Sequence, residues 1–135
     1  MTNSKYIEYL KTEIEGQLLE RKRASISPKD VTQYISSFAN AEGGKLVIGI
    51  EDNGEISGFN HAKAKNKELY LEAPYEHLNR IPRYTHQLID VMNHNGIMDQ
   101  ILVFDIEPSY DAIITLKDDS VYLRINDKSR KLTHN

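Results

Sequence analysis

The stretch Ser27–Phe59 reads SPKDVTQYISSFANAEGGKLVIGIEDNGEISGF and contains the strongest fold signals of the chain. Ser27 can cap a helix, Pro28 suits the first helical position, and Asp30 lies in the first turn. Apolar side chains then recur every three or four residues, at Val31, Tyr34, Ile35 and Phe38. This spacing predicts a helix that packs one face on a sheet.

Gly43 and Gly44 are predicted to stop that helix. The next residues, KLVIGI at 45–50, form a short apolar and β-branched run, which is typical of a strand buried on both faces. The acidic turn Glu51–Gly54 follows and includes Asn-Gly, a strong hairpin signal, so residues 55–59 are predicted to return as a brief strand. The glycine pair lies at the helix C-terminus, where the dipole repels anions, so it is a helix stop and no phosphate cradle.

The flanking segments extend this pattern. Ile7, Leu10 and Ile14 predict a short amphipathic helix over residues 4–14 that Gly16 ends. The remaining predicted elements are a strand within 17–23, a helical stretch within 61–84 that ends before Pro82, and β structure from His86 with turns at Asn95-Gly96 and Asp118-Asp119. We therefore predict an α+β (α/β) fold, with a mixed β-sheet, two or three packed helices and C-terminal β-hairpins.

Composition limits the function classes. The 135 residues suit one domain, residues 1–135, and no run approaches the roughly 18 apolar residues of a membrane span. The first residues lack the apolar core of a signal peptide, so we expect a cytoplasmic protein without membrane partners. The chain has no cysteine, which leaves carboxylates, His, Lys, Ser or Tyr for any chemistry.

The net charge of −3 gives no overall attraction to a polyanion, so any such site must be local. Basic residues cluster at 21–23, at Lys63, Lys65 and Lys67, and at Arg124, Lys128, Arg130 and Lys131. Clusters of this kind are often only solvated faces. A Walker-type nucleotide site is not expected, because no Lys-Ser/Thr follows the glycine pair.

Within residues 15–59 the sequence resembles the AlbA-like domain of the Schlafen family, which has also been described as a divergent AAA or ATP-binding domain. The shared positions are Glu15, Glu20, Lys22, Phe38-Ala39-Asn40, Gly43-Gly44, Ile48-Gly49-Ile50, Asp52, Gly54, Ile56 and Gly58. Near the C-terminus, Tyr122 and Arg124 match the closing Tyr-x-Arg strand of the family. Arg21 departs from the usual Phe, which predicts that its strand is at a sheet edge or that its inner face is shifted. Ala41 in place of Thr is a mild change.

The resemblance implies a catalytic metal site. In members that cut RNA, the positions equivalent to Glu15, Glu20 and Asp52 hold a divalent metal, and three carboxylates suit Mg²⁺ or Mn²⁺. Gly16 would break the chain so that Glu15 and Glu20 can turn toward each other. Alternatively, the two glutamates are exposed acids beside Lys11 and Arg23, and Asp52 only forms a turn.

Two functions follow from the resemblance. The first is a metal-dependent endoribonuclease for structured RNA such as tRNA, with Lys22, Arg124, Lys128, Arg130 and Lys131 as the residues that hold the nucleic acid. Lys22 could instead pair with a neighbouring acid. The second is a non-catalytic DNA-binding or RNA-binding, or transcription-regulatory, module. RNA is expected in preference to DNA. A homodimer would supply the second lobe of the Schlafen core.

Overall fold

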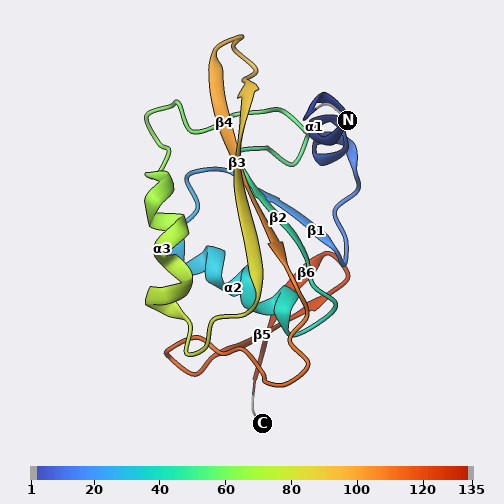
Figure 1. Ribbon diagram of the computed structural model, residues 1–135, viewed down its shortest axis with the longest axis vertical. Coiled ribbons are helices and arrows are strands. Elements are labelled where there is room, and N and C mark those ends of the chain that lie inside the picture. Colours follow the sequence, from blue (N-terminus) through green and yellow to red (C-terminus); the bar gives the residue numbers. More distant parts are fainter. Residues whose placement is uncertain (1–2, 134–135) are drawn as a thin grey trace.

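The computed structural model describes residues 3–133, so the outermost two residues at each end of the predicted 1–135 domain lie outside the described range. Its elements follow the predicted order of helices and strands, and the class is α+β (Figure 1). They are α1 (Asn3–Thr12), β1 (Leu19–Lys22), α2 (Pro28–Ala39), β2 (Gly44–Ile48), α3 (Lys67–His77), β3 (Tyr84–Met92), β4 (Met98–Ile106), β5 (Val121–Ile125) and β6 (Lys128–Leu132).

Four strands form one mixed sheet in the order β1-β2-β4-β3. β1 and β2 run parallel, whereas β4 is antiparallel to both β2 and β3. β5 and β6 form a separate C-terminal hairpin beside β1 and α2 (Figure 1). The expected mixed sheet and C-terminal hairpin are therefore confirmed.

The sheet has an apolar layer on each face. On one face, side chains such as Leu46, Ile48 and Phe104 pack with α2 and α3. On the other face, Leu19, Val47 and their neighbours pack with α1. Alternate residues of β2 thus enter different cores, which explains why the run at 45–50 is apolar without alternation. None of the helices in residues 3–133 has the length and apolar character needed to cross a membrane.

The α2 helix begins and ends where the sequence indicates. The Ser27 side chain accepts a hydrogen bond from the Asp30 N–H at 3.1 Å, and Pro28 opens the helix. After Ala39 the chain turns, and the Gly43 N–H donates to the Phe38 carbonyl at 2.8 Å. Gly43 has a φ of +80°, and a Cβ there would lie 2.5 Å from the Ile106 carbonyl oxygen. The glycine pair is thus a helix stop that also lets β4 approach closely.

The predicted N-terminal helix is wrong at its end. α1 stops at Thr12, two residues before the predicted end at residue 14, and Ile14, part of the predicted apolar stripe, is 84% exposed. The cause is Arg21 of β1, whose guanidinium donates to the carbonyls of Leu10 and Glu13 and so replaces further helical hydrogen bonds. Arg21 is buried, and β1 is an edge strand, which agrees with the first of the two alternatives predicted from this residue.

The brief strand predicted at 55–59 is reduced to one bridge, between Ile50 and Ile56. Beyond it, the N–H groups of Ser57 and Gly58 both donate to the Gly49 carbonyl, so the chain bends across the end of β2 and no ladder forms. The acidic turn itself forms as expected, closed by a hydrogen bond from the Gly54 N–H to the Glu51 carbonyl. This bend positions Asp52 beyond the end of β2.

Candidate metal centre and nucleic-acid interface

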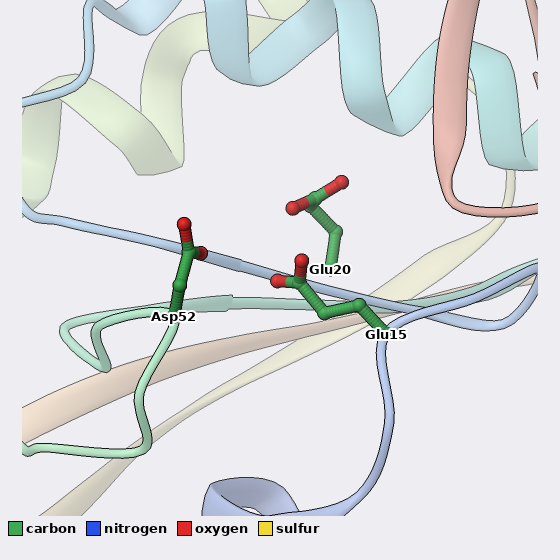
Figure 2. Close-up of side chains that lie close together, drawn as sticks. All are labelled: Glu15, Glu20 and Asp52. Carbon is green, nitrogen blue, oxygen red and sulfur yellow. The ribbon is translucent and has the colours of Figure 1, made fainter.

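Three carboxylates from three separate segments meet on one side of β1. Glu20 is the second residue of β1, Glu15 lies in the connection before it, and Asp52 lies in the turn after β2. One oxygen from each of them lies within 4.8 Å of the other two. Figure 2 shows the carboxyl groups turned toward a common region, although their backbones enter from different directions. The structure therefore brings together the three acids that the sequence grouped.

Local hydrogen bonds fix Glu15 beside Glu20. Gly16 begins a tight turn in which its N–H donates to the Leu19 carbonyl at 3.2 Å. This turn reverses the chain, and the Glu15 Oε2 then accepts a hydrogen bond from the Arg21 N–H at 2.7 Å. Because β1 is an edge strand, that N–H is available to a side chain. Glu15 and Glu20 can thus converge despite a spacing of five residues.

Asp52 is brought to the cluster by the parallel pairing of β1 and β2. The two strands run side by side with Glu20 opposite Leu46 and Lys22 opposite Ile48. Chain leaving β2 therefore passes the end of β1, and the turn at 51–54 presents Asp52 from there. Unlike Glu20, which is buried, Asp52 is exposed. The cluster therefore has one buried and one open side.

Arg124 occupies the buried side. Its side chain is fully buried, and its guanidinium donates to Glu20 Oε1 at 2.9 Å and to the carbonyls of Gly16 and Leu19. The guanidinium also lies over the Phe38 ring, 4.7 Å from its centroid. These contacts leave Arg124 no exposed donor for a phosphate, which argues against the phosphate contact predicted for it. Arg124 instead positions Glu20 and the turn that carries Glu15.

The pKa of Glu20 reflects the opposing charges around this residue. Burial raises the pKa of Glu20, Arg124 lowers it, and the neighbouring Glu15 raises it further, with a net result of about 7. One arginine therefore does not offset the cost of placing a second carboxylate beside a buried one. Functional sites often contain such crowded like charges, because a bound cation can relieve them.

Lys22 lies close to the same cluster. Its Nζ is 3.9 Å from Glu20 Oε2 and 4.9 Å from the centroid of the Tyr34 ring. Burial lowers the pKa of Lys22, but Tyr34 and Glu20 outweigh burial and raise it, so the side chain is a cation. The position of Lys22 is compatible with both an ion pair to Glu20 and a contact to a phosphate, because the side chain lies beside Glu20 and also lines an open hollow.

That hollow is built from the end of β1 and the turn after β2. Lys22, Arg23 and Asp52 are among the residues that line it. Arg23 contributes an ion pair, with its Nε 2.7 Å from Glu51 Oε1. Local sequence does not predict the pairing of Arg23 with Glu51, because the parallel pairing of β1 with β2 is what places these two residues together.

The donor set and spacing fit a hard divalent cation. Ligand oxygens around Mg²⁺ lie about 3.0 Å apart when adjacent and about 4.2 Å apart when opposite, since each Mg–O distance is about 2.1 Å. Three ligands include at most one opposite pair, so the oxygens of Glu15, Glu20 and Asp52, which lie within 4.8 Å of one another, would need to move closer by up to about 2 Å. Rotation of the exposed Asp52 side chain can supply part of this change, so Glu15, Glu20 and Asp52 could hold Mg²⁺ or Mn²⁺.

The C-terminal hairpin carries the remaining predicted cations. Lys128, Arg130 and Lys131 lie on β6 and are exposed. Between them, the Ser129 hydroxyl accepts a hydrogen bond from Arg124 at 3.1 Å. The hairpin is thus tied to the carboxylate cluster through Ser129 and Arg124.

Comparison with known proteins identifies the family. The model of the family described as Schlafen, AlbA_2 matches residues 15–133. The chain belongs to the Schlafen AlbA_2 family. Membership supports a role related to nucleic acid at the level of the family, and the Schlafen AlbA_2 match begins at Glu15, the first residue of the cluster.

Solved structures show the same fold. Of 19 matching chains, the crystal structure of the DIP2311 protein from Corynebacterium diphtheriae superimposes with a TM-score of 0.55 at 17% sequence identity. The match covers 86% of the Schlafen AlbA_2 chain described here but only 22% of the DIP2311 chain. The comparison with curated proteins finds no significant match.

Proposed function

We propose that this Schlafen AlbA_2 domain is a divalent-metal-dependent endonuclease that acts on RNA, with Glu15, Glu20 and Asp52 as the metal ligands. The observation that carries the proposal is the convergence of the three carboxylates within 4.8 Å. When bound there, Mg²⁺ or Mn²⁺ would activate a water molecule and neutralise the charge that develops on the phosphate. The preference for RNA over DNA rests on the family resemblance.

The surrounding residues support binding of a polyanion at the cluster. Lys22 lies at the rim of the open hollow and can contact a phosphate as a point charge. The exposed Lys128, Arg130 and Lys131 offer further phosphate contacts on the hairpin. These local cations compensate for the net charge of −3. Arg124 orients Glu20 from the buried side of the cluster and shields that side from water.

The test compares wild-type protein with Asp52→Asn. Asp52 is exposed, so the substitution removes one ligand without disturbing the buried Arg124 pair. Glu72→Gln, an exposed carboxylate on α3, is the matched control. tRNA and single-stranded DNA are incubated with each protein in Mn²⁺ or in chelator, and Mn²⁺ binding is measured separately by calorimetry.

We expect cleavage of tRNA by the wild type and the Glu72→Gln variant in Mn²⁺, no cleavage in chelator, and a loss of at least about tenfold in both cleavage rate and Mn²⁺ affinity for Asp52→Asn. Cleavage that persists in chelator would refute the metal site. Binding without cleavage in any condition would instead favour the alternative, a non-catalytic nucleic-acid-binding or regulatory module.

We also propose a homodimer through the edge strand β3. β3 pairs with β4 on one side, and within residues 3–133 no strand pairs with its other side. Antiparallel pairing of two copies about Leu88 would place His86 of each copy opposite Asp90 of the other, which is a complementary arrangement. Light scattering at micromolar concentration should give twice the mass of the chain, and Leu88→Lys should restore the monomer. A wild-type monomer would refute the dimer.

A further inference from the structure

A second hollow adjoins the one over Asp52. The two hollows share Arg23, Ser25, Glu51 and Asn53 in their linings. The second hollow then continues away from the carboxylates toward the loop after Phe59 and the turn between β3 and β4. A nucleic-acid strand that lies across the carboxylate cluster could thus continue into the second hollow.

The far end of this hollow is lined by side chains that are free to bind. Asn60, His61 and Lys63 lie on the loop before α3, and among the described residues 3–133 no hydrogen bond or ion pair engages their side chains. The loop is held against the end of β1, because the Lys65 N–H donates to the Ala24 carbonyl at 2.7 Å. The basic segment at 63–67 that the sequence singled out is therefore placed beside Arg23.

The other charges in the lining are largely paired. Arg23 is 2.7 Å from Glu51, and the His94 Nε2 is 3.5 Å from Glu55 Oε1. The hollow therefore offers amide, imidazole and carboxylate groups with little net positive charge. Such a lining suits the hydrogen-bonding edge of an unpaired nucleobase better than a bare phosphate, since a base presents donors and acceptors but no charge.

The walls are held in position by a network around Asp99. Its carboxylate accepts hydrogen bonds from the N–H groups of Phe59 and Asn60, and from the Asn93 side chain at 3.0 Å. On the opposite wall, the His94 ring nitrogen Nδ1 contacts the Ile56 carbonyl at 2.8 Å. The backbone at Phe59 and Asn60 and the ring of His94 are thus held in place before any ligand binds, which lowers part of the entropic cost of recognition.

We propose that this second hollow binds the base of an unpaired RNA nucleotide next to the phosphate held at the carboxylate cluster, and so determines base preference. The inference rests on the proposed function, because the cluster defines where the neighbouring phosphate lies. Asn60 reads the edge of the base, His61 stacks on its face, and Lys63 contacts the following phosphate.

The experiment measures base preference apart from cleavage. Fluorescence anisotropy gives the affinities of labelled ten-nucleotide RNAs of A, C or U, and of one mixed RNA that contains G, in chelator. The proteins are the wild type, His61→Ala, Asn60→Ala with His61→Ala, and Glu72→Gln. Glu72, an exposed residue on α3 that lines neither hollow and lies outside β3, is the control. The sites cut in a mixed RNA in Mn²⁺ are mapped by sequencing.

We expect the wild type to prefer one base by about tenfold, and the double variant to lose about tenfold in affinity for that base while the other affinities change little. His61→Ala alone, at an exposed position, should lose part of this preference with an unchanged melting temperature. The Glu72→Gln variant should match the wild type.

Two outcomes separate the two proposals. Metal-dependent cleavage with equal affinity for all bases, or a preference that both hollow variants retain, would refute the base-binding hollow alone. A base preference that the variants abolish, in a protein that never cleaves RNA, would refute the nuclease alone and leave the hollow as part of a binding module.

Discussion

Arg124→Gln is predicted to destabilise the fold without acting as a phosphate-contact mutation. The substitution leaves the buried Glu20 carboxylate and the carbonyls of Gly16 and Leu19 without their donor. Removing one partner of a buried ion pair costs about 3–5 kcal/mol. With a urea m value of about 2 kcal/mol/M, the unfolding midpoint should fall by about 2 M.

The matched control is Arg130→Gln. Arg130 is exposed on β6, so its loss should change the free energy of unfolding by less than about 0.5 kcal/mol. It should weaken RNA binding and lower the slope of log affinity against log salt by about one. Urea unfolding followed by circular dichroism measures the change in stability. Fluorescence anisotropy at several salt concentrations measures the change in RNA binding. The reasoning would be refuted if Arg124→Gln left the midpoint unchanged and only weakened RNA binding.

Three further substitutions test the framework. Asp99→Asn turns one acceptor into a donor that faces two N–H groups, and should cost about 3 kcal/mol at pH 7. The pKa of Asp99 is lowered because hydrogen bonds to its carboxylate outweigh burial, so its stabilisation is complete above the ordinary value and is lost as pH falls through the lowered pKa. The difference in urea midpoint between the two proteins should accordingly shrink at low pH, and a constant difference would count against this. Gly58→Ala should cost at least about 2 kcal/mol, because φ is +65° and the new Cβ would lie 2.1 Å from Asp99 Oδ2; an unchanged melting temperature would contradict the close approach. Asn40→Ala removes three hydrogen bonds that join α2 to residues 114 and 122, and should cost about 2–3 kcal/mol in the same unfolding assay, with a loss below 0.5 kcal/mol as the contrary result.

Much of the fold could be predicted because its signals are local. The Ser27 cap, Pro28 and the glycine pair bound α2, and the apolar run at 45–50 identifies a strand buried on both faces. Each signal depends on backbone geometry or side-chain periodicity within a few residues. The end of α1 could not be predicted in this way, because Arg21, a residue outside the helix, donates to the carbonyls of Leu10 in the last turn and of Glu13 just after it.

The candidate site likewise has features that the sequence predicts and features that depend on the fold. The sequence, through its family resemblance, named Glu15, Glu20 and Asp52, and their residue types alone made a hard-cation site chemically sensible. Their convergence depends on the turn at Gly16 and on the parallel pairing of β1 with β2. Neither the distance between these carboxylates nor the burial of Glu20 follows from spacing along the chain.

Local patterns in the chain are enough to predict most of the helices and strands and the helix stop at Gly43-Gly44, and the family resemblance names the acids available for a metal. The fold is needed to see that Arg124 is a buried partner of Glu20, and that Arg23 and Lys63 line neighbouring hollows. The physical reason is that 104 residues separate Glu20 from Arg124 in the chain. Whether a charge meets water or another charge depends on which segments the sheet and hairpin bring together, and local sequence carries no record of that pairing.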